Sequence, residues 1–320
     1  MGNFPTYPTE EIAFSVVLSM TGENILYAQR MATGDQHFVY AVKTEKSEYV
    51  IRMTDTSQKD KFISAIYWQE KLLPLGIPLA KFIKTDLECK FSQFPSLLML
   101  RLPGDDLCNL YSRLTDFNKR HLANEMVKIQ AMTGQLPDGP SYGIVDSYER
   151  ITEHTSWYDF LVHRLHLFDE IIRKNGVFND IEMEKVFSIA KKLEDKFRLI
   201  HARPFLWDAS ERNVIVNNGK ISGIVDVDEI CFGDSLFVLG LTYSALENEG
   251  FDTLYCDYWS EALRMDNKAQ IRLAFYRLFY VIVFMRKHSM TSGNQQKIIF
   301  NDQRLKNMFK QSLEMIKRII

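Results

Sequence analysis

The chain has 320 residues and a formal net charge of −2 at pH 7. Hydrophobic residues make up 46% and charged residues 25% of it, which is the composition of a globular protein with a full core. The near-neutral charge argues against a dedicated nucleic-acid binder, because such a protein needs a concentrated basic face.

The cysteines and the apolar runs bear on where the protein works. The four cysteines are scattered without a Cys-x-x-Cys pair, which predicts buried thiols in a reducing compartment. The N-terminus has no signal pattern, and the longest apolar run, 273–285, carries Arg277 and is too short to cross a bilayer. We therefore expect a cytoplasmic protein with no membrane partner.

The first third of the chain predicts a small sheet with helices. A helix is expected over 9–20, where Thr9 can cap the first turn. Three strand-like runs follow, at 25–31, 38–44 and 48–53, and the last two alternate clearly. A helix over 60–73 and a buried strand that begins at 95 come next.

The remainder of the chain is mainly helical in pattern. Helices are expected at 115–133, from 156 onward, and at 180–200, 236–248, 251–264, 267–288 and 301–319. The sequence therefore predicts an α+β, two-lobed enzyme with a cleft between its lobes. The small antiparallel β lobe would cover residues 1–102 and the large helical lobe residues 103–320.

The most informative stretch is 204–234, PFLWDASERNVIVNNGKISGIVDVDEICFGD. Asp208 is followed five residues later by Asn213, and then by two strand-like runs that an Asn-Gly turn joins. Such a turn is a strong hairpin signal, so Asn213 and Asp226, at the two ends of the hairpin, should be neighbours. Their oxygens suit Mg²⁺ that carries nucleotide phosphates, and Asp208 lies where a base could meet a substrate hydroxyl.

This arrangement resembles the catalytic and metal-binding loops of the aminoglycoside phosphotransferase and choline kinase-like family, relatives of the protein kinases. In this family the loops have the sequence pattern His-x-Asp-x-x-x-x-Asn, which is followed by a hairpin, by Ile-Asp and then by Gly-Asp. Asp208, Asn213, Asp226 and Asp234 fall in register, but Leu206 replaces the His that holds the loop. The resemblance implies a protein-kinase-like fold and Mg²⁺-dependent transfer of the γ-phosphate of ATP or GTP to a hydroxyl. Asp208 would be the catalytic base, with Asn213 and Asp226 as metal ligands.

The resemblance also implies nucleotide-binding residues in the small lobe. The loop 32–37, with Gly34, would cover the phosphates, and Arg52 would anchor them. In the family a Glu on the following helix orients this cation. The simplest alignment puts Ala65 at that position, so Glu70, about a turn further on, is the candidate. The backbone groups of Arg101 and Leu102 would meet a purine edge.

The phosphate acceptor is expected to be a small molecule, and a cationic one is an option. Asp228, two residues after Asp226, could reach the metal through water or cap a turn. A set of acids that follow Asp226 in the chain could line a cleft for a cation, although a solvated helix face explains them equally well: Glu229, Glu247, Glu249, Asp252, Asp257 and Glu261.

Two rival hypotheses stay open. Leu206 and the missing helix Glu favour a nucleotide-binding module with little turnover, like a pseudokinase, whereas the intact Asp208, Asn213 and Asp226 oppose it. An atypical protein kinase ranks third, because the chain lacks the Gly-x-Gly-x-x-Gly, His-Arg-Asp and Asp-Phe-Gly motifs.

Overall fold

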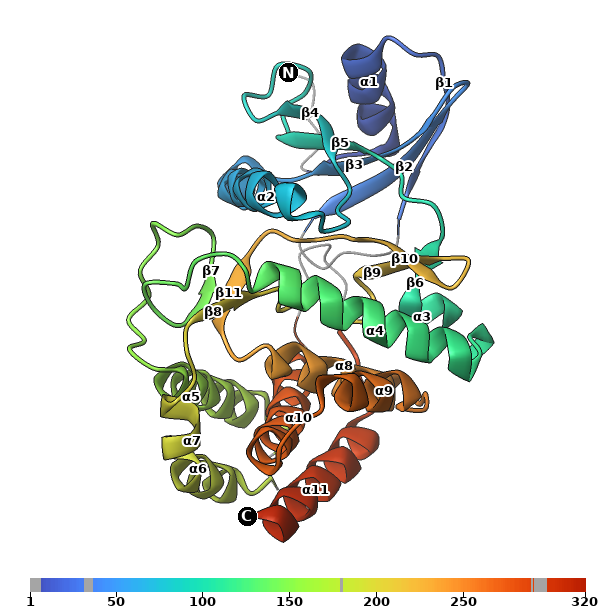
Figure 1. The fold of residues 1–320 in the computed structure, drawn as a ribbon. Coiled ribbons are helices and arrows are strands. Elements are labelled where there is room, and N and C mark those ends of the chain that lie inside the picture. The colour runs from blue at the N-terminus through green and yellow to red at the C-terminus, as the bar shows by residue number, and fades with distance from the viewer. Residues whose placement is uncertain (1–6, 32–36, 179–180, 289, 291–297) are drawn as a thin grey trace.

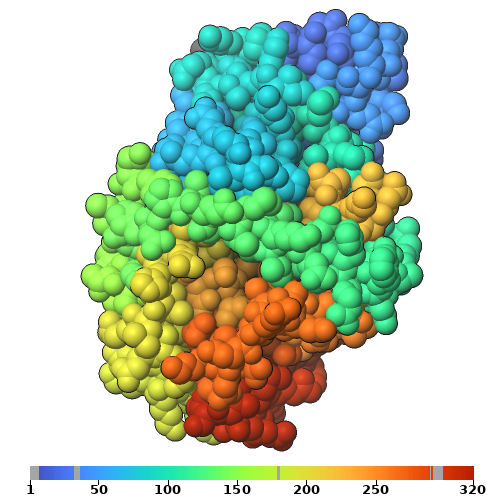
Figure 2. Space-filling view, viewed as in Figure 1, coloured from blue at the N-terminus to red at the C-terminus, as the bar shows by residue number. Residues whose placement is uncertain are grey.

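The protein has two lobes, as the sequence predicts. The computed structural model describes residues 7–31, 37–178, 181–288, 290 and 298–320. Figure 1 shows a small lobe that carries the larger sheet, and beneath it a larger lobe made mainly of helices. In the space-filling view of Figure 2 the small lobe, blue to cyan, is seated on the green-to-red large lobe. The α+β prediction is therefore confirmed.

The small lobe is built on a five-stranded sheet in the order β1-β2-β3-β5-β4. All neighbouring strands are antiparallel. The strands are β1 Ile25–Arg30, β2 Phe38–Thr44, β3 Glu48–Met53, β4 Phe82–Asp86 and β5 Ser96–Leu100. The first three and β5 match the predicted runs, whereas β4 was not predicted.

Two helices flank this sheet. Helix α1, Glu10–Thr21, begins where the Thr9 hydroxyl accepts a hydrogen bond from the Ile12 amide at 3.3 Å, as its N-cap. Its buried face packs on β1 and β2. Helix α2, Lys59–Leu72, lies on the side of the sheet that faces the large lobe (Figure 1). Two of its residues, Lys61 and Ser64, contact the segment 226–229, which we call the metal loop.

The large lobe holds nine helices within the part of the chain that the structure describes. They are α3 Leu107–Leu110, α4 Asp116–Thr133, α5 Trp157–Asn175, α6 Met183–Lys192, α7 Glu194–Arg198, α8 Leu236–Glu249, α9 Leu254–Leu263, α10 Asn267–Lys287 and α11 Asp302–Ile319. The single helix predicted over 180–200 is wrong, because the backbone turns at Leu193 between α6 and α7. None of the described helices combines the length and the apolar character needed to cross a bilayer.

Two small sheets position the central loops. Strands β9 Val214–Asn217 and β10 Lys220–Ile224 form a hairpin, and β6 Asp105–Asp106 adds to the β9 edge. Gly104 precedes β6 at φ +105°, where a side chain would collide with the Val216 backbone. The second sheet joins β7 Gly143–Val145, β11 Ile230–Gly233 and β8 Arg203–Phe205. It fixes both ends of the stretch that carries the candidate site.

Asp234 ties this stretch to the helical core. Its carboxylate accepts hydrogen bonds from the Leu236 amide at 3.1 Å, from Arg272 at 2.7 Å and from the Tyr276 hydroxyl at 2.8 Å. The first bond satisfies the start of α8, and the other two hold α10. Asp234 is therefore a structural residue beyond the metal loop.

Candidate functional site

The predicted hairpin is present and brings its two ends together. Asn218 and Gly219 have φ of 50° and 74°, as a two-residue turn matched to strand twist requires. At the open end, the Val225 amide donates a hydrogen bond to the Asn213 carbonyl at 2.9 Å. Asn213 and Asp226 consequently line the same cavity. The prediction that they are neighbours is confirmed.

This cavity lies between the lobes and has a volume of about 490 Å³, within the range of small-ligand sites. The small lobe contributes the apolar side chains Ala41 and Val50, and the hairpin contributes Ile215 and Ile224. Arg52, Asn213 and Asp226 add charged and amide groups to the lining. The cavity therefore combines an apolar slot with oxygen and guanidinium groups.

Asp208 lies beside this cavity but is not among the described residues that line it. The side-chain amide of Asn213 donates a hydrogen bond to the Asp208 main-chain carbonyl at 2.8 Å, which joins the two residues. Burial, together with the negative charge of Asp226, raises the pKa of Asp208 to about 7, while the charge of Lys287 opposes this rise. The carboxylate therefore holds a proton more tightly than an exposed aspartate does.

Asn213 and Asp226 present side-chain oxygens that fit a hard cation, although Arg52 already contacts one of the Asp226 oxygens. The Asn213 amide nitrogen is used on Asp208, which leaves its side-chain oxygen available. Asp226 has a left-handed φ of 60°, and its side chain keeps 40% of its surface exposed. Burial of the carboxyl raises its pKa, an effect that the charge of Arg52 opposes. Amide and carboxylate oxygens are the donors that Mg²⁺ prefers, so this pair fits the ion that the resemblance implies.

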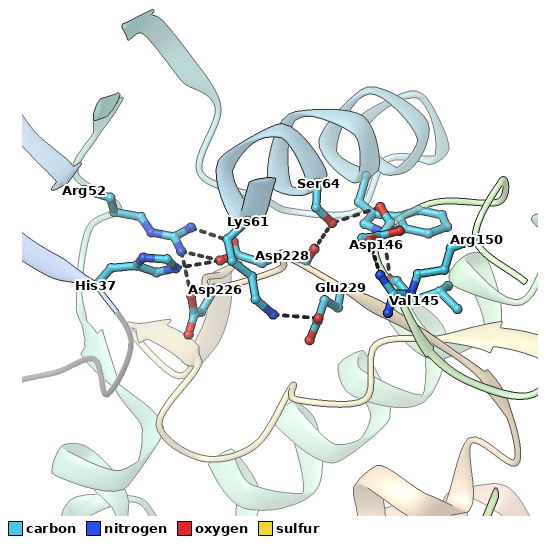
Figure 3. Close-up of polar contacts among 11 residues, drawn as sticks. His37, Arg52, Lys61, Ser64, Val145, Asp146, Arg150, Asp226, Asp228 and Glu229 are labelled. Atoms are coloured by element: carbon cyan, nitrogen blue, oxygen red, sulfur yellow. Dashed lines mark hydrogen bonds and ion pairs between the residues drawn. The ribbon is translucent and has the colours of Figure 1, made fainter. Parts of the chain in front are cut away.

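The strongest polar cluster in the site joins Arg52 to the metal loop (Figure 3). Arg52 donates to both oxygens of Asp228, at 2.8 and 2.6 Å, and to Asp226 at 2.9 Å. His37 lies 3.0 Å from the same Asp228 carboxylate, and Arg52, His37 and Asp228 are all buried. Burial alone would raise the pKa of Asp228, but the charge of Arg52 and the hydrogen bonds from His37 and Arg52 hold it well below its usual range.

Helix α2 adds further contacts to the metal loop. The Ser64 hydroxyl donates to the main-chain carbonyl of Asp228, and it lies 2.9 Å from the carbonyl of Asp146. Lys61 forms an ion pair with Glu229 at 2.6 Å, and Figure 3 shows both contacts below the helix. The segment 226–229 is therefore held from the small lobe by strands and by helix α2.

The predicted contact between Arg52 and Glu70 is not formed. Glu70 is exposed, whereas Ala65 and Gln69 are the positions of α2 that face the cavity. One residue along a helix turns the side chain by about 100°, which carries Glu70 away from Arg52. Asp228 supplies the carboxylate instead. Its side chain points at Arg52, so the suggested turn cap does not describe it.

Of the other three nucleotide-binding candidates, the structure describes two. Gly34 lies outside the described residues. Arg101 and Leu102 both line the cavity. The Arg101 amide already donates to the Glu48 carbonyl at 2.9 Å, so its own carbonyl and the groups of Leu102 are the candidates for a purine edge.

The catalytic loop has a support that sequence reasoning missed. Leu206 stands where the family has His, and it is buried. Gln130 of α4 accepts a hydrogen bond from the Leu206 amide at 3.0 Å and donates one to its carbonyl at 2.9 Å. Gln130 thus fixes the segment around Leu206 to helix α4. A buried amide beside Ile129, in the apolar stripe of α4, was the signal that could have revealed it.

The acids expected to receive a cation already have partners on this chain. Glu249 pairs with Arg212 at 2.5 Å, and Asp252 with Lys119 at 2.7 Å. The remaining contacts are Glu229 with Lys61, Glu247 with Arg277, Glu261 with Arg120, and Asp257 with the Tyr243 hydroxyl. These side chains are therefore engaged in intrachain contacts, and they give a cationic acceptor little support.

Comparisons with known proteins agree with this architecture. The structure of a thermostable mutant of the aminoglycoside phosphotransferase APH(4)-Ia, in a ternary complex with ADP and hygromycin B, matches with a TM-score of 0.63 at 15% identity, over 97% of this chain and 98% of that one. ADP-bound APH(2'')-Ib matches with a TM-score of 0.62 at 13% identity, over 98% and 99%. The GDP complex of an aminoglycoside 2'-phosphotransferase-IIIa gives 0.60 at 13%, over 97% of both chains. At these identities the likeness shows the fold, which is the protein-kinase-like one that the resemblance implied.

The family assignment rests on a separate comparison. A search of curated protein sequences found no significant match. The model of the phosphotransferase enzyme family matches residues 29–273, which is more than half of the chain and includes the hairpin, Arg52 and Asp208. The chain therefore belongs to the phosphotransferase enzyme family.

Proposed function

We propose that the protein is a small-molecule kinase that transfers the γ-phosphate of ATP or GTP to a hydroxyl group. The observation that supports it most is the convergence of Asn213 and Asp226 on one interlobe cavity, with Asp208 hydrogen-bonded to Asn213 beside it. Phosphoryl transfer needs the phosphates positioned, their charge neutralised and a hydroxyl oriented in line. Each need has a matching group in this site.

The cavity suits a nucleoside triphosphate. A flat base would lie between Ala41 and Val50 on one side and Ile215 and Ile224 on the other, all of which line the cavity. Its edge would meet the backbone at Leu102, and Arg52 would contact the phosphates. Nothing in this slot distinguishes adenine from guanine. We place the nucleotide lobe at residues 1–102 and the catalytic lobe at 103–320.

Asn213 and Asp226 would hold Mg²⁺ through their side-chain oxygens. A bound Mg²⁺ supplies charge neutralisation at the phosphate oxygens. Of the protein's own groups, Arg52 shares this task, because its guanidinium already lies 2.9 Å from Asp226.

Asp208 would orient the acceptor hydroxyl and take its proton. The hydroxyl oxygen forms a bond to the γ-phosphorus, the bond to the bridging oxygen breaks, and the proton passes to the Asp208 carboxylate. A pKa raised to about 7 suits a group that accepts a proton near neutral pH. The hydrogen bond from Asn213 to its main-chain carbonyl fixes the loop beside the metal site.

Asp228 would position the phosphate-binding cation. In this structure it holds both terminal nitrogens of Arg52, at 2.8 and 2.6 Å. Planar, two-point pairing fixes the direction of a guanidinium as well as its place. Asp228 would therefore take the orienting role for which Glu70 was the candidate in the sequence.

The test is a phosphate-transfer screen with ATP and GTP in parallel, across amino sugars, amino alcohols and nucleosides. Asp208→Asn should abolish transfer and leave Mg²⁺-nucleotide binding intact, because the side chain loses its proton-accepting charge but keeps its size. Wild-type turnover in Asp208→Asn would refute the assigned role.

The binding-only rival has one observation in its favour. Arg52 donates to Asp226, so the cation and a metal ion share that carboxylate. If the wild-type protein bound Mg²⁺-nucleotide but gave no transfer to any acceptor and no hydrolysis, this rival would replace the kinase.

A further inference from the structure

Three side chains that can bind a metal ion gather outside the candidate site: Glu153 and His154 in the loop before α5, and His163 in the second turn of α5. We call them the His–Glu group. One ligand atom from each residue lies within 4.8 Å of the other two. None of the three is among the described residues that line the interlobe cavity. Figure 1 shows β7 and α5, which this loop joins, at the left of the large lobe and the hairpin β9–β10 at its right. The group is therefore separate from the metal loop.

Hydrogen bonds of the main chain fix the position of His154. Its amide donates to the Thr152 hydroxyl at 3.4 Å, and its carbonyl accepts from the Tyr142 amide at 3.2 Å. Thr152 is bonded to the same segment before β7. Its hydroxyl donates to the Tyr142 carbonyl at 2.6 Å, and its amide donates to the Ser141 hydroxyl at 2.8 Å. The loop is therefore tied to the chain that leads into β7.

Packing also fixes the ring of His154. It meets the ring of Phe160 edge-on, with the two centroids 5.6 Å apart. Gly143 of β7 has a φ of +114°, and a Cβ at this position would lie 2.8 Å from Phe160 and 3.6 Å from His154. The absence of a side chain at Gly143 therefore lets both rings pack against β7. The half-buried imidazole of His154 is consequently held in one place.

Helix α5 brings a second imidazole to the first. The ring centroids of His154 and His163 are 5.0 Å apart in a T-shaped arrangement. Side chains lean toward the N-terminus of their helix, and α5 begins directly after the loop, at its N-cap Ser156. The Nδ1 of His163 lies 3.5 Å from a carboxylate oxygen of Glu153. The side chains of Glu153 and His163 keep 73% and 44% of their surface exposed, so both can turn without disturbing the core.

An ordinary ion pair does not account for all three residues. An exposed pair such as Glu153 with His163 contributes little to stability, and it does not involve His154. The distances suit a shared ion better. Ligand atoms bound to tetrahedral Zn²⁺ at 2.0–2.1 Å lie about 3.3 Å from one another. The separation of 3.5 Å between Glu153 and His163 is close to this value. The limit of 4.8 Å for the group leaves an inward movement of at most about 1.5 Å for the exposed side chains.

We propose that the His–Glu group binds a divalent transition-metal ion, for which Zn²⁺ is the best match. Zn²⁺ takes imidazole nitrogen and carboxylate oxygen as ligands, and three protein ligands leave its fourth position to water. Mg²⁺ and Ca²⁺ prefer sites made of oxygen alone, so this group would select against them. The bound ion would join the loop 152–154 to α5. The inference does not depend on the proposed kinase function, because none of these residues takes part in it.

Zn²⁺ titrations of the full chain, freed of any affinity tag, test the site. Calorimetry in excess Mg²⁺ should show that one Zn²⁺ binds per chain. Glu153→Gln and His163→Gln each remove one ligand atom from an exposed side chain. Each variant should weaken Zn²⁺ binding about tenfold or more, because even the loss of a residue that only supports a ligand costs about 10–100-fold.

The matched control is His121→Gln on α4. His121 lies 3.6 Å from Glu125, which makes an exposed His–Glu pair of the same kind, but this pair belongs to no three-residue group among the described residues. His121→Gln should leave Zn²⁺ affinity unchanged. Thermal denaturation adds a second measurement. Zn²⁺ should raise the midpoint of the wild-type protein and of His121→Gln, and this rise should be lost in His163→Gln. Equal midpoints of all variants without Zn²⁺ check the fold.

Two outcomes would overturn the inference: no binding by the wild-type protein at Zn²⁺ concentrations up to about 100 μM, or binding that both Glu153→Gln and His163→Gln leave unchanged. The second outcome would place the ion elsewhere on the chain. Neither outcome bears on the phosphate-transfer screen, so failure of this site and failure of the proposed function are distinguishable.

Discussion

The guanidinium of Arg52 is held from below by Asp228, with hydrogen bonds of 2.8 and 2.6 Å to its two carboxylate oxygens. These residues belong to different lobes, β3 above and the loop after β10 below. The carboxylate that orients Arg52, the proposed phosphate anchor, therefore comes from the segment that also carries Asp226, the proposed metal ligand. Under the proposed function, the positions of the anchor and of the metal ligand are coupled through residues 226–228.

Removal of Asp228 should affect both nucleotide binding and stability. Asp228→Ala leaves a buried arginine with a weaker partner, and loss of one member of a buried ion pair costs about 3–5 kcal/mol. Arg52 would also lose its direction, so nucleotide affinity should fall about tenfold. Urea denaturation and calorimetry with ATP measure the two effects.

The matched control is Glu70→Ala, because Glu70 is exposed on α2. It should change the free energy of unfolding by less than about 0.5 kcal/mol and leave nucleotide affinity unchanged. The opposite pattern, a loss of affinity in Glu70→Ala but not in Asp228→Ala, would return the orienting role to the helix.

Substitution of Asp226 should remove the effect of Mg²⁺ on nucleotide affinity. Asp226→Asn keeps an oxygen but loses the charge that favours a divalent ion. The wild-type protein should bind ATP more tightly with Mg²⁺ than with EDTA, and Asp226→Asn should abolish this difference. Titrations with and without Mg²⁺ give the answer, and an unchanged Mg²⁺ effect would rule Asp226 out as a ligand.

Local signals predicted the hairpin and four of the strands of the small lobe. The Asn218-Gly219 turn needs only two residues with positive φ, and the alternation in β2 and β3 is a property of each strand alone. Chain order then placed Asn213 and Asp226 at one end of the hairpin. Such features depend on residues that are close in sequence, so the sequence alone could predict them.

The contacts that support the site could not be predicted in this way. Arg52 and Asp228 are 176 positions apart, and Gln130 and Leu206 are 76 apart. Which of many polar residues meet across such separations depends on how the lobes pack. The choice of Glu70 failed for this reason: a helix position was assumed to face the cation, and the packing of α2 turned its neighbours toward the cavity instead.

Gln130 should prove essential to the catalytic loop. Gln130→Met keeps the size of the side chain but leaves the buried amide and carbonyl of Leu206 without partners. Each unsatisfied group costs about 1–3 kcal/mol, so the variant should lose about 2–6 kcal/mol of stability and much of its turnover. Thermal denaturation and the transfer assay measure both.

Lys128→Met, on the exposed face of the same helix, is the control and should be nearly neutral. If Gln130→Met were equally neutral, the loop would have to be held by other contacts, and the replacement of the family His by Leu206 would need a different account.

A buried carboxyl near the site should make stability depend on pH. Glu211 is 3% exposed, one of its oxygens has no partner among the described residues, and burial raises its pKa to about 7. Because the folded state binds this proton more tightly than the unfolded chain, Glu211 contributes stability below its unfolded pKa, and that contribution is lost as the pH rises to about 7. Glu211→Gln mimics the protonated form. It should therefore raise the free energy of unfolding by about 1–3 kcal/mol at pH 8 and have little effect at pH 4.5.

Urea denaturation at the two pH values tests this, with the exposed Glu184→Gln as control. A Glu211→Gln effect of the same size at both pH values would show that the side chain acts through packing and not through its charge.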